Sequence, residues 1–229
     1  MPMQIPKEYR QAVERLIKLD EDSVDSLLVA LKAADPAISP RSLARAIASD
    51  VPIDIGPLTD LLTALISLIL SVTGSKSSDQ DPGMEVAQAA AKAELGDMEP
   101  GSEAESRFAA RVARFLELAD KLYITSKASS VYFAHQSLFQ RSKILSDIRT
   151  IFGPGETIEP IAGMIVHQLE IVASEDNGVR SHYIAMNIHD LRELRRAIDR
   201  AIAKETALRK VISDSGLQFL EDAPTRHQR

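Results

Sequence analysis

The sequence predicts an α+β fold that is mostly helical: an N-terminal helical bundle, further helices, and a C-terminal three-stranded antiparallel β-meander followed by one long helix. Three observations lead to it. Apolar residues recur at helical spacing through residues 7–72. From about residue 144 to 187, short runs of β-branched and apolar residues alternate with turn sequences. Helical spacing then returns over residues 188–212.

Composition limits the class of protein. The 229 residues are 45% hydrophobic, which suits a buried core, and the formal charge of −6 argues against general binding of polyanions. The absence of cysteine excludes disulfides, thiolate zinc sites and cysteine nucleophiles, and it is consistent with a reducing compartment. The first residues lack a basic region followed by an apolar stretch, so we expect no secretory signal and a cytoplasmic protein.

Three short helices are expected before residue 50. The segment 7–18 carries apolar residues at helical spacing, and Asp22 or Ser23 can cap a second helix. Ser39 and Pro40 then begin a third helix, because serine is a good cap and proline is tolerated in the first turn.

The segment 53–72 has about the length that a bilayer core requires of a helix. Acidic residues, glycine and proline interrupt its first half, so the unbroken apolar run covers only 61–72, which is too short to cross. We therefore expect no membrane span but a central core helix with Leu65 and Ile69 buried, in a bundle over residues 1–74.

Residues 75–101 are rich in serine, glycine, proline and acidic side chains around an alanine-rich stretch at 84–95. This composition is typical of a flexible acidic linker, which we expect to be the most mobile interior segment. Ser102 and Glu105 then predict a capping box at the start of connecting helices over 102–142.

A β-β-β-α domain is expected over residues 143–220. Its strands are predicted at LSDIRTIF, IAGMIVHQLEIVA and VRSHYIAMN, with Asn177-Gly178 favouring a hairpin turn. Asn187 can cap a long helix that ends near Gly216. The apolar positions on one face of that helix are Leu191, Leu194, Ile198, Ala201, Ile202, Leu208 and Ile212.

This order of elements behind a helical domain resembles the COMM-domain family over about residues 143–212. The residues that carry the resemblance are Asp147-Ile148-Arg149 at the entry to the first strand, MIVHQLEI in the second strand, and YIAMNIHDLRELRRAI, where the last strand runs into a helix that begins with a DL pair. The resemblance implies a non-enzymatic scaffold protein whose terminal domains interlock in pairs.

Both faces of the second predicted strand are partly apolar. Ile165, His167, Leu169 and Ile171 lie on one face, and Met164, Val166 and Val172 lie on the other around Gln168 and Glu170. One helix covers only one face of such a sheet, so either the helices at 103–139 or a second copy must cover the other. We expect the copy, with Met164, Val166 and Val172 as the candidate oligomer interface.

The sequence predicts no catalytic, cofactor-binding or metal-binding residue. Four histidines, His135, His167, His182 and His189, precede or lie in the terminal domain, but no HExxH motif or close carboxylate pairing accompanies them. No GxSxG motif occurs, and the loop around Pro154 lacks the lysine and the serine or threonine of a phosphate-binding loop.

Arg192, Arg196, Arg200 and Lys204 recur every four residues on the last helix, opposite its apolar positions. Such a basic face is most often solvated, but it can also dock an acidic partner or nucleic acid. We therefore expect a non-enzymatic interaction or scaffold module that self-associates through its C-terminal domain. The alternatives are a regulatory nucleic-acid-binding protein that uses this basic face, for which the overall charge is unfavourable, and an enzyme with an unrecognised site.

Overall fold

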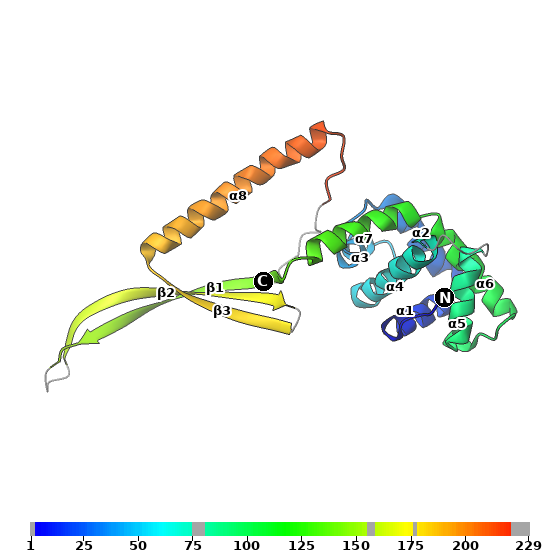
Figure 1. Cartoon of the computed structure of the whole chain (residues 1–229), viewed down its shortest axis with the longest axis horizontal. Coiled ribbons are helices and arrows are strands. Elements are labelled where there is room, and N and C mark those ends of the chain that lie inside the picture. The colour runs from blue at the N-terminus through cyan, green and yellow to red at the C-terminus, as the bar shows by residue number, and fades with distance from the viewer. Residues whose placement is uncertain (1–2, 75–80, 155–158, 176–177, 221–229) are drawn as a thin grey trace. The chain divides into compact units, whose positions relative to one another are not determined.

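The computed structural model divides the chain into two compact units, one over residues 1–132 and 220–229 and the other over residues 133–219 (Figure 1). It describes residues 3–74, 81–154, 159–175 and 178–220. The predicted fold class is confirmed: the described residues form a mostly helical α+β arrangement with a three-stranded antiparallel sheet and a long last helix.

The helical unit consists of helices connected by short loops. Its elements are the 3-10 helices η1 (Lys7–Tyr9) and η2 (Leu95–Asp97), and the helices α1 (Arg10–Lys18), α2 (Glu21–Ala33), α3 (Pro40–Ile47), α4 (Ile55–Gly74), α5 (Pro82–Lys92), α6 (Glu103–Leu116) and α7 (Ala119–Phe133). Ser39 caps α3 and Pro40 occupies its first turn, as predicted.

The cap of α2 differs from the prediction, which placed it at Asp22 or Ser23. Asp20 is the cap, because its backbone is extended while residues 21–23 are already helical. The Asp20 carboxylate accepts hydrogen bonds from the Ser23 amide at 2.7 Å and the Ser23 hydroxyl at 2.9 Å. These hydrogen bonds hold the pKa of Asp20 below its usual value.

Helix α4 lies in the core of the helical unit. Leu65 and Ile69 are 2% and 0% exposed, so their predicted burial is confirmed. In the described part of the chain, α4 is also the one helix long and apolar enough to cross a membrane, and half of its most apolar window is buried inside the protein. Burial of that kind is typical of a core helix.

The structure corrects the predicted flexible linker over 75–101. Residues 75–80 lie outside the described residues, but α5 packs along α6 and buries Val86, Ala87, Ala89, Ala90 and Ala91. Small side chains allow this close approach of two helices. A Cβ atom added at Gly83 would lie 2.6 Å from the backbone oxygen of Ala109. The alanine-rich stretch is therefore a packing surface.

The predicted connecting helices over 102–142 also belong in large part to the helical unit. Arg111 on α6 donates from Nη1 to three carbonyls at the end of α1, and Lys121 on α7 donates from Nζ to three carbonyls at the end of α2. Cations at helix C-termini satisfy unpaired carbonyls and interact favourably with the helix dipole. The buried Thr125 hydroxyl accepts a hydrogen bond from the Ala37 amide at 3.2 Å.

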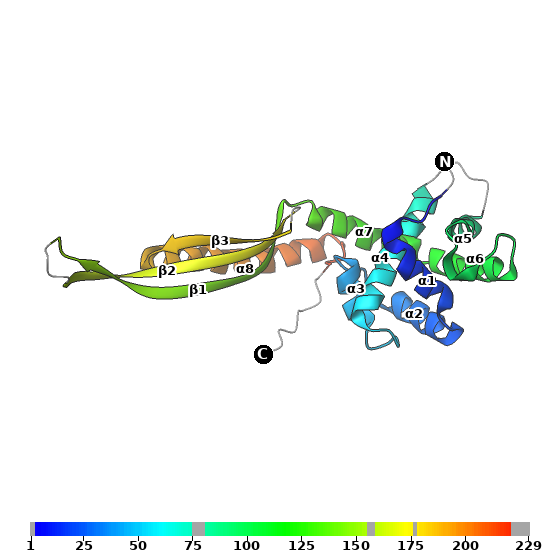
Figure 2. The same ribbon diagram turned by 90° about the horizontal axis from the view of Figure 1, so that it is seen from below.

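The C-terminal unit is built from the strands β1 (Ser137–Phe152), β2 (Pro160–Glu175) and β3 (Gly178–Met186) and the helix α8 (Ile188–Asp214). The strands pair antiparallel in the order β1-β2-β3 (Figure 2). Strand β1 starts earlier than the prediction near residue 144, and α7 ends at Phe133. The predicted extension of the connecting helices to residue 142 and the boundary at 143 are therefore corrected. The reason is that β1 pairs with the whole of β2, from Ser137 opposite Glu175 onwards.

The close contact of α5 with α6 predicts different effects of alanine at two helical glycines. Gly83→Ala should lower the free energy of unfolding by about 1–3 kcal/mol, because the added methyl meets backbone. Gly56→Ala, which has open space around it, should be neutral or stabilising by up to about 1 kcal/mol. Urea denaturation followed by circular dichroism measures both. Equal stabilities would contradict a tight α5–α6 contact.

The position of α4 predicts that an acidic side chain is tolerated only at its exposed beginning. Leu65→Asp should destabilise the helical unit by about 3 kcal/mol or more, because it buries an unpaired charge. Ile55→Asp, at a 46% exposed position in the first turn, should change stability by less than about 0.5 kcal/mol. Thermal unfolding of the two variants provides the comparison, and a Leu65 variant as stable as the parent would rule out the core role of α4.

Candidate interaction surface

One face of the sheet carries five large aliphatic side chains in two groups. Ile144, Leu169 and Ile184 stand opposite one another across the three strands. Ile148 stands opposite Ile165 four residues farther along β1, and the polar pair Ser146 and His167 lies between the two groups. We call these five residues the aliphatic face. Leu169 is buried, but Ile148 and Ile165 are 77% and 62% exposed. Large apolar side chains gathered on an exposed surface mark sites of association.

The opposite face is mixed in character, because β1 contributes charges to it. The residues of β1 on this face include Arg141, Lys143, Asp147 and Arg149. Glu170 at its centre accepts hydrogen bonds from the hydroxyls of Ser181 and Tyr183 at 3.4 Å and lies 3.9 Å from the Arg141 guanidinium. Polar groups already partner one another here. We call this surface the mixed face.

The three residues predicted as the oligomer interface lie on the mixed face. Met164 stands opposite Arg149, Val166 stands opposite Asp147, and Val172 is already buried. The predicted interface therefore lies on the more polar of the two faces, and its role in association stays a prediction. The prediction considered β2 alone, whereas the character of a sheet face depends equally on the strands that flank it. The isoleucines of β1 and β3, which the register places beside Leu169, are the residues that it missed.

The histidines of the sheet make contacts across strands. His167 Nδ1 lies 2.7 Å from the Ser146 hydroxyl, and His182 Nε2 lies 3.2 Å from Oε1 of Glu175. Arg180 also lies near Glu175, at 3.8 Å. Within the described ranges, no three histidine or acidic side chains gather closely enough to hold a metal ion. Ser146 and His167 thus lie within the aliphatic face, between its two groups, and Glu175, Arg180 and His182 lie beyond Leu169 on the same face.

Helix α8 has no buried residue among its 27 residues. Its apolar side chains are open to solvent, with Ile198, Ile202 and Leu208 50%, 61% and 59% exposed. The predicted basic face is present and exposed on the other side of the helix, at Arg192, Arg196, Arg200 and Lys204. Both surfaces of α8 are therefore available for contacts.

The connection between β3 and α8 consists of a single residue, Asn187. The predicted cap is confirmed as a full capping box: Asn187 Oδ1 accepts from the amides of His189 and Asp190, and the Asp190 carboxylate accepts from the Asn187 amide at 2.9 Å. Strand-to-helix connections that fold a helix back over a sheet commonly have about 2–6 residues. This shorter connection directs α8 away from its own sheet.

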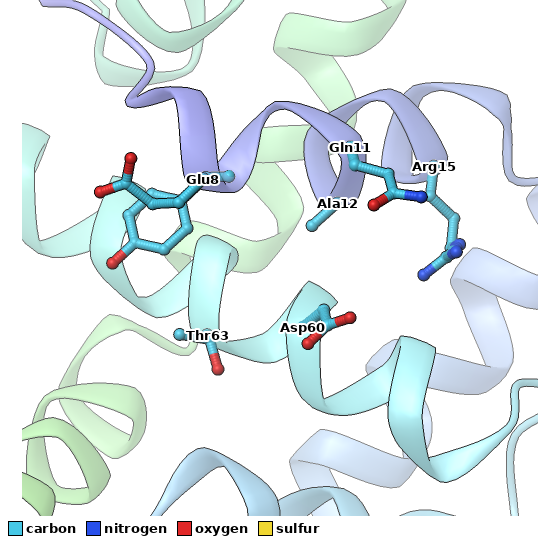
Figure 3. Close-up of a pocket in the computed structure, with 7 residues that line it drawn as sticks. Glu8, Gln11, Ala12, Arg15, Asp60 and Thr63 are labelled. Atoms are coloured by element: carbon cyan, nitrogen blue, oxygen red, sulfur yellow. The ribbon is translucent and has the colours of Figure 1, made fainter. Parts of the chain in front are cut away.

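A small cavity of about 120 Å³ lies between α1 and α4 in the helical unit (Figure 3). Its lining consists of Glu8, Tyr9, Gln11, Ala12, Arg15, Asp60 and Thr63. Arg15 donates to the backbone oxygen of Pro57 at 3.5 Å. The cavity has room for a few water molecules, and its lining offers no nucleophile paired with a base. This arrangement does not define a reaction.

No protein-family model matches the sequence, and no curated protein is significantly similar to it. The resemblance to the COMM-domain family therefore stays a prediction. What the fold and the surface define is a two-unit α+β protein with a packed helical unit and a C-terminal sheet that carries an uncovered aliphatic face.

Proposed function

We propose that this chain is a non-enzymatic, cytoplasmic protein-interaction module that self-associates through its C-terminal unit. One observation carries the proposal. Among the described hydrophobic residues of that unit, only Leu169, Val172 and Ala173 are buried. A unit of about this size needs a much larger buried core to offset the entropy cost of ordering its chain. A second layer of protein supplies that core.

The chain itself offers little to cover the aliphatic face. Helix α8 is directed away from the sheet by Asn187, and α6 uses Phe108, Val112 and Phe115 in the helical unit. Of the helices at 103–139, α6 thus has its principal apolar side chains in use, while Ile124, Val131 and Phe133 of α7 are exposed, so cover by α7 is the alternative to a second copy.

A second copy is the partner that fits best. Two-fold symmetry brings the same surface of each copy together, so the aliphatic side chains of one copy can pack on those of the other. Burying the four exposed isoleucines contributes roughly 1 kcal/mol each. The aliphatic face therefore makes a substantial contribution to association, and additional contacts complete the interface.

Two neighbouring residues on β2 test which face is covered. Ile165 and Met164 are 62% and 52% exposed and lie on opposite faces. Ile165→Lys in the full chain should convert a dimer to monomer or aggregate, because a lysine ammonium would enter the apolar interface. Met164→Lys should keep the dimer, since lysine there joins the mixed face.

Light scattering during gel filtration at micromolar concentration gives the mass of each variant. Ile148→Lys, at a second exposed position on the aliphatic face, should behave like Ile165→Lys. A parent chain that is monomeric and fully folded would refute self-association. If Met164→Lys alone dissociates the dimer, the interface lies on the mixed face.

A further inference from the structure

Helix α8 carries a regular seven-residue repeat along one side. Leu191, Leu194, Ile198, Ala201, Glu205, Leu208 and Ile212 follow one another at alternating spacings of three and four residues. We call these positions the α8 seam. They correspond to a and d positions of successive heptads, the pattern by which helices wind around other helices. This periodicity points to a helical partner for α8 and argues against a sheet in that role.

We propose that α8 forms a parallel, in-register, two-stranded coiled coil with α8 of a second copy. The proposal rests on the self-association proposed above and identifies a separate part of its interface. Two of the a positions are isoleucine, Ile198 and Ile212, and two of the d positions are leucine, Leu194 and Leu208. β-Branched residues at a with leucine at d favour parallel dimers over higher oligomers.

Glu205 provides the argument for orientation and register. It occupies one a position in an otherwise apolar seam, and a single polar residue at such a position fixes register at a cost in stability. In a parallel in-register pair, Lys204 at the preceding g position lies beside the partner's Glu205, and the reverse contact is made by symmetry. Arg209 on the same helix already binds Glu205 at 2.8 Å. The two Glu205 carboxylates meet in one layer of such a pair, and the Lys204 and Arg209 cations offset their mutual repulsion.

An antiparallel pair loses this charge complementarity. Since a layers then meet d layers, Glu205 would face an alanine or a leucine of the other helix. The parallel arrangement also keeps Arg192, Arg196 and Arg200 at b, f and c positions, on the outside of the pair. These three arginines of the basic face then remain exposed for an acidic partner, while Lys204 lies at the edge of the seam.

Two alanines of α8 make a matched test. Ala201 lies in the seam and Ala203 lies at an f position on the outside, so aspartate has a similar intrinsic cost to the helix at both. In the full chain, Ala201→Asp should weaken dimerisation about 100-fold or more, and Ala203→Asp should leave it within about threefold. Sedimentation equilibrium measures both dissociation constants.

A second variant gains affinity, so its outcome does not depend on a damaged fold. Glu205→Leu should tighten the dimer about tenfold or more, because it completes the apolar seam. Equal dissociation constants for the parent, the two alanine variants and Glu205→Leu, all dimeric, would overturn the coiled coil while leaving self-association intact. A folded monomeric parent would overturn both proposals.

Orientation is tested with a single thiol, since the chain has no cysteine. Ile212→Cys should form an intermolecular disulfide under mild oxidation, because parallel helices bring the two positions into contact. In an antiparallel pair the two thiols would be separated by about 20 Å or more. A dimer that resists this cross-link, but cross-links when Leu191→Cys and Ile212→Cys chains are mixed, would overturn the parallel arrangement.

Discussion

The short connection between β3 and α8 constrains the whole C-terminal unit. Asn187 serves at once as the only residue between strand and helix and as the helix cap, with hydrogen bonds to the amides of His189 and Asp190. A helix started this abruptly has no loop with which to turn back over the sheet. Two apolar surfaces, the aliphatic face and the α8 seam, are consequently left uncovered, and we propose that association between copies buries both.

The packing of the helical unit differs from that of the C-terminal unit. Each of its short helices is marginal alone, and packing into one hydrophobic core stabilises them, with long-range polar contacts at their ends. Arg111 and Lys121 bind the carbonyl ends of α1 and α2, while Arg111 and Arg114 pair with Glu21, and Arg114 with Asp25. The Asp25 carboxylate beside Arg114 raises the pKa of that guanidinium. This unit is complete within one chain.

The sequence was sufficient for the elements with strong local signals. The helix starts at Ser39 and Asn187, the burial of Leu65 and Ile69, and the three-stranded meander with its terminal helix were all predicted, because caps, periodicity and turn residues act over a few positions.

Features that depend on distant partners were not predictable in the same way. Alanine contributes little apolar area, so the composition of residues 84–95 resembles that of a linker. The packing of α5 on α6, which buries these alanines, depends on a segment distant in the sequence. The face of the sheet that carries the aliphatic set depends on register, which places Ile144 and Ile184 beside Leu169. The sequence of β2 alone does not contain the register, and for this reason the predicted interface was Met164, Val166 and Val172.

The central claim is that the C-terminal unit obtains its core from a second copy. Amide hydrogen exchange of the full chain at two protein concentrations, one well above and one well below the dissociation constant, tests it most directly. Protection over β1, β2, β3 and α8 should fall on dilution, while protection over α1–α6 stays constant. Protection of β2 and α8 that is strong and independent of concentration would contradict the account, because those elements would then be stable within a single chain.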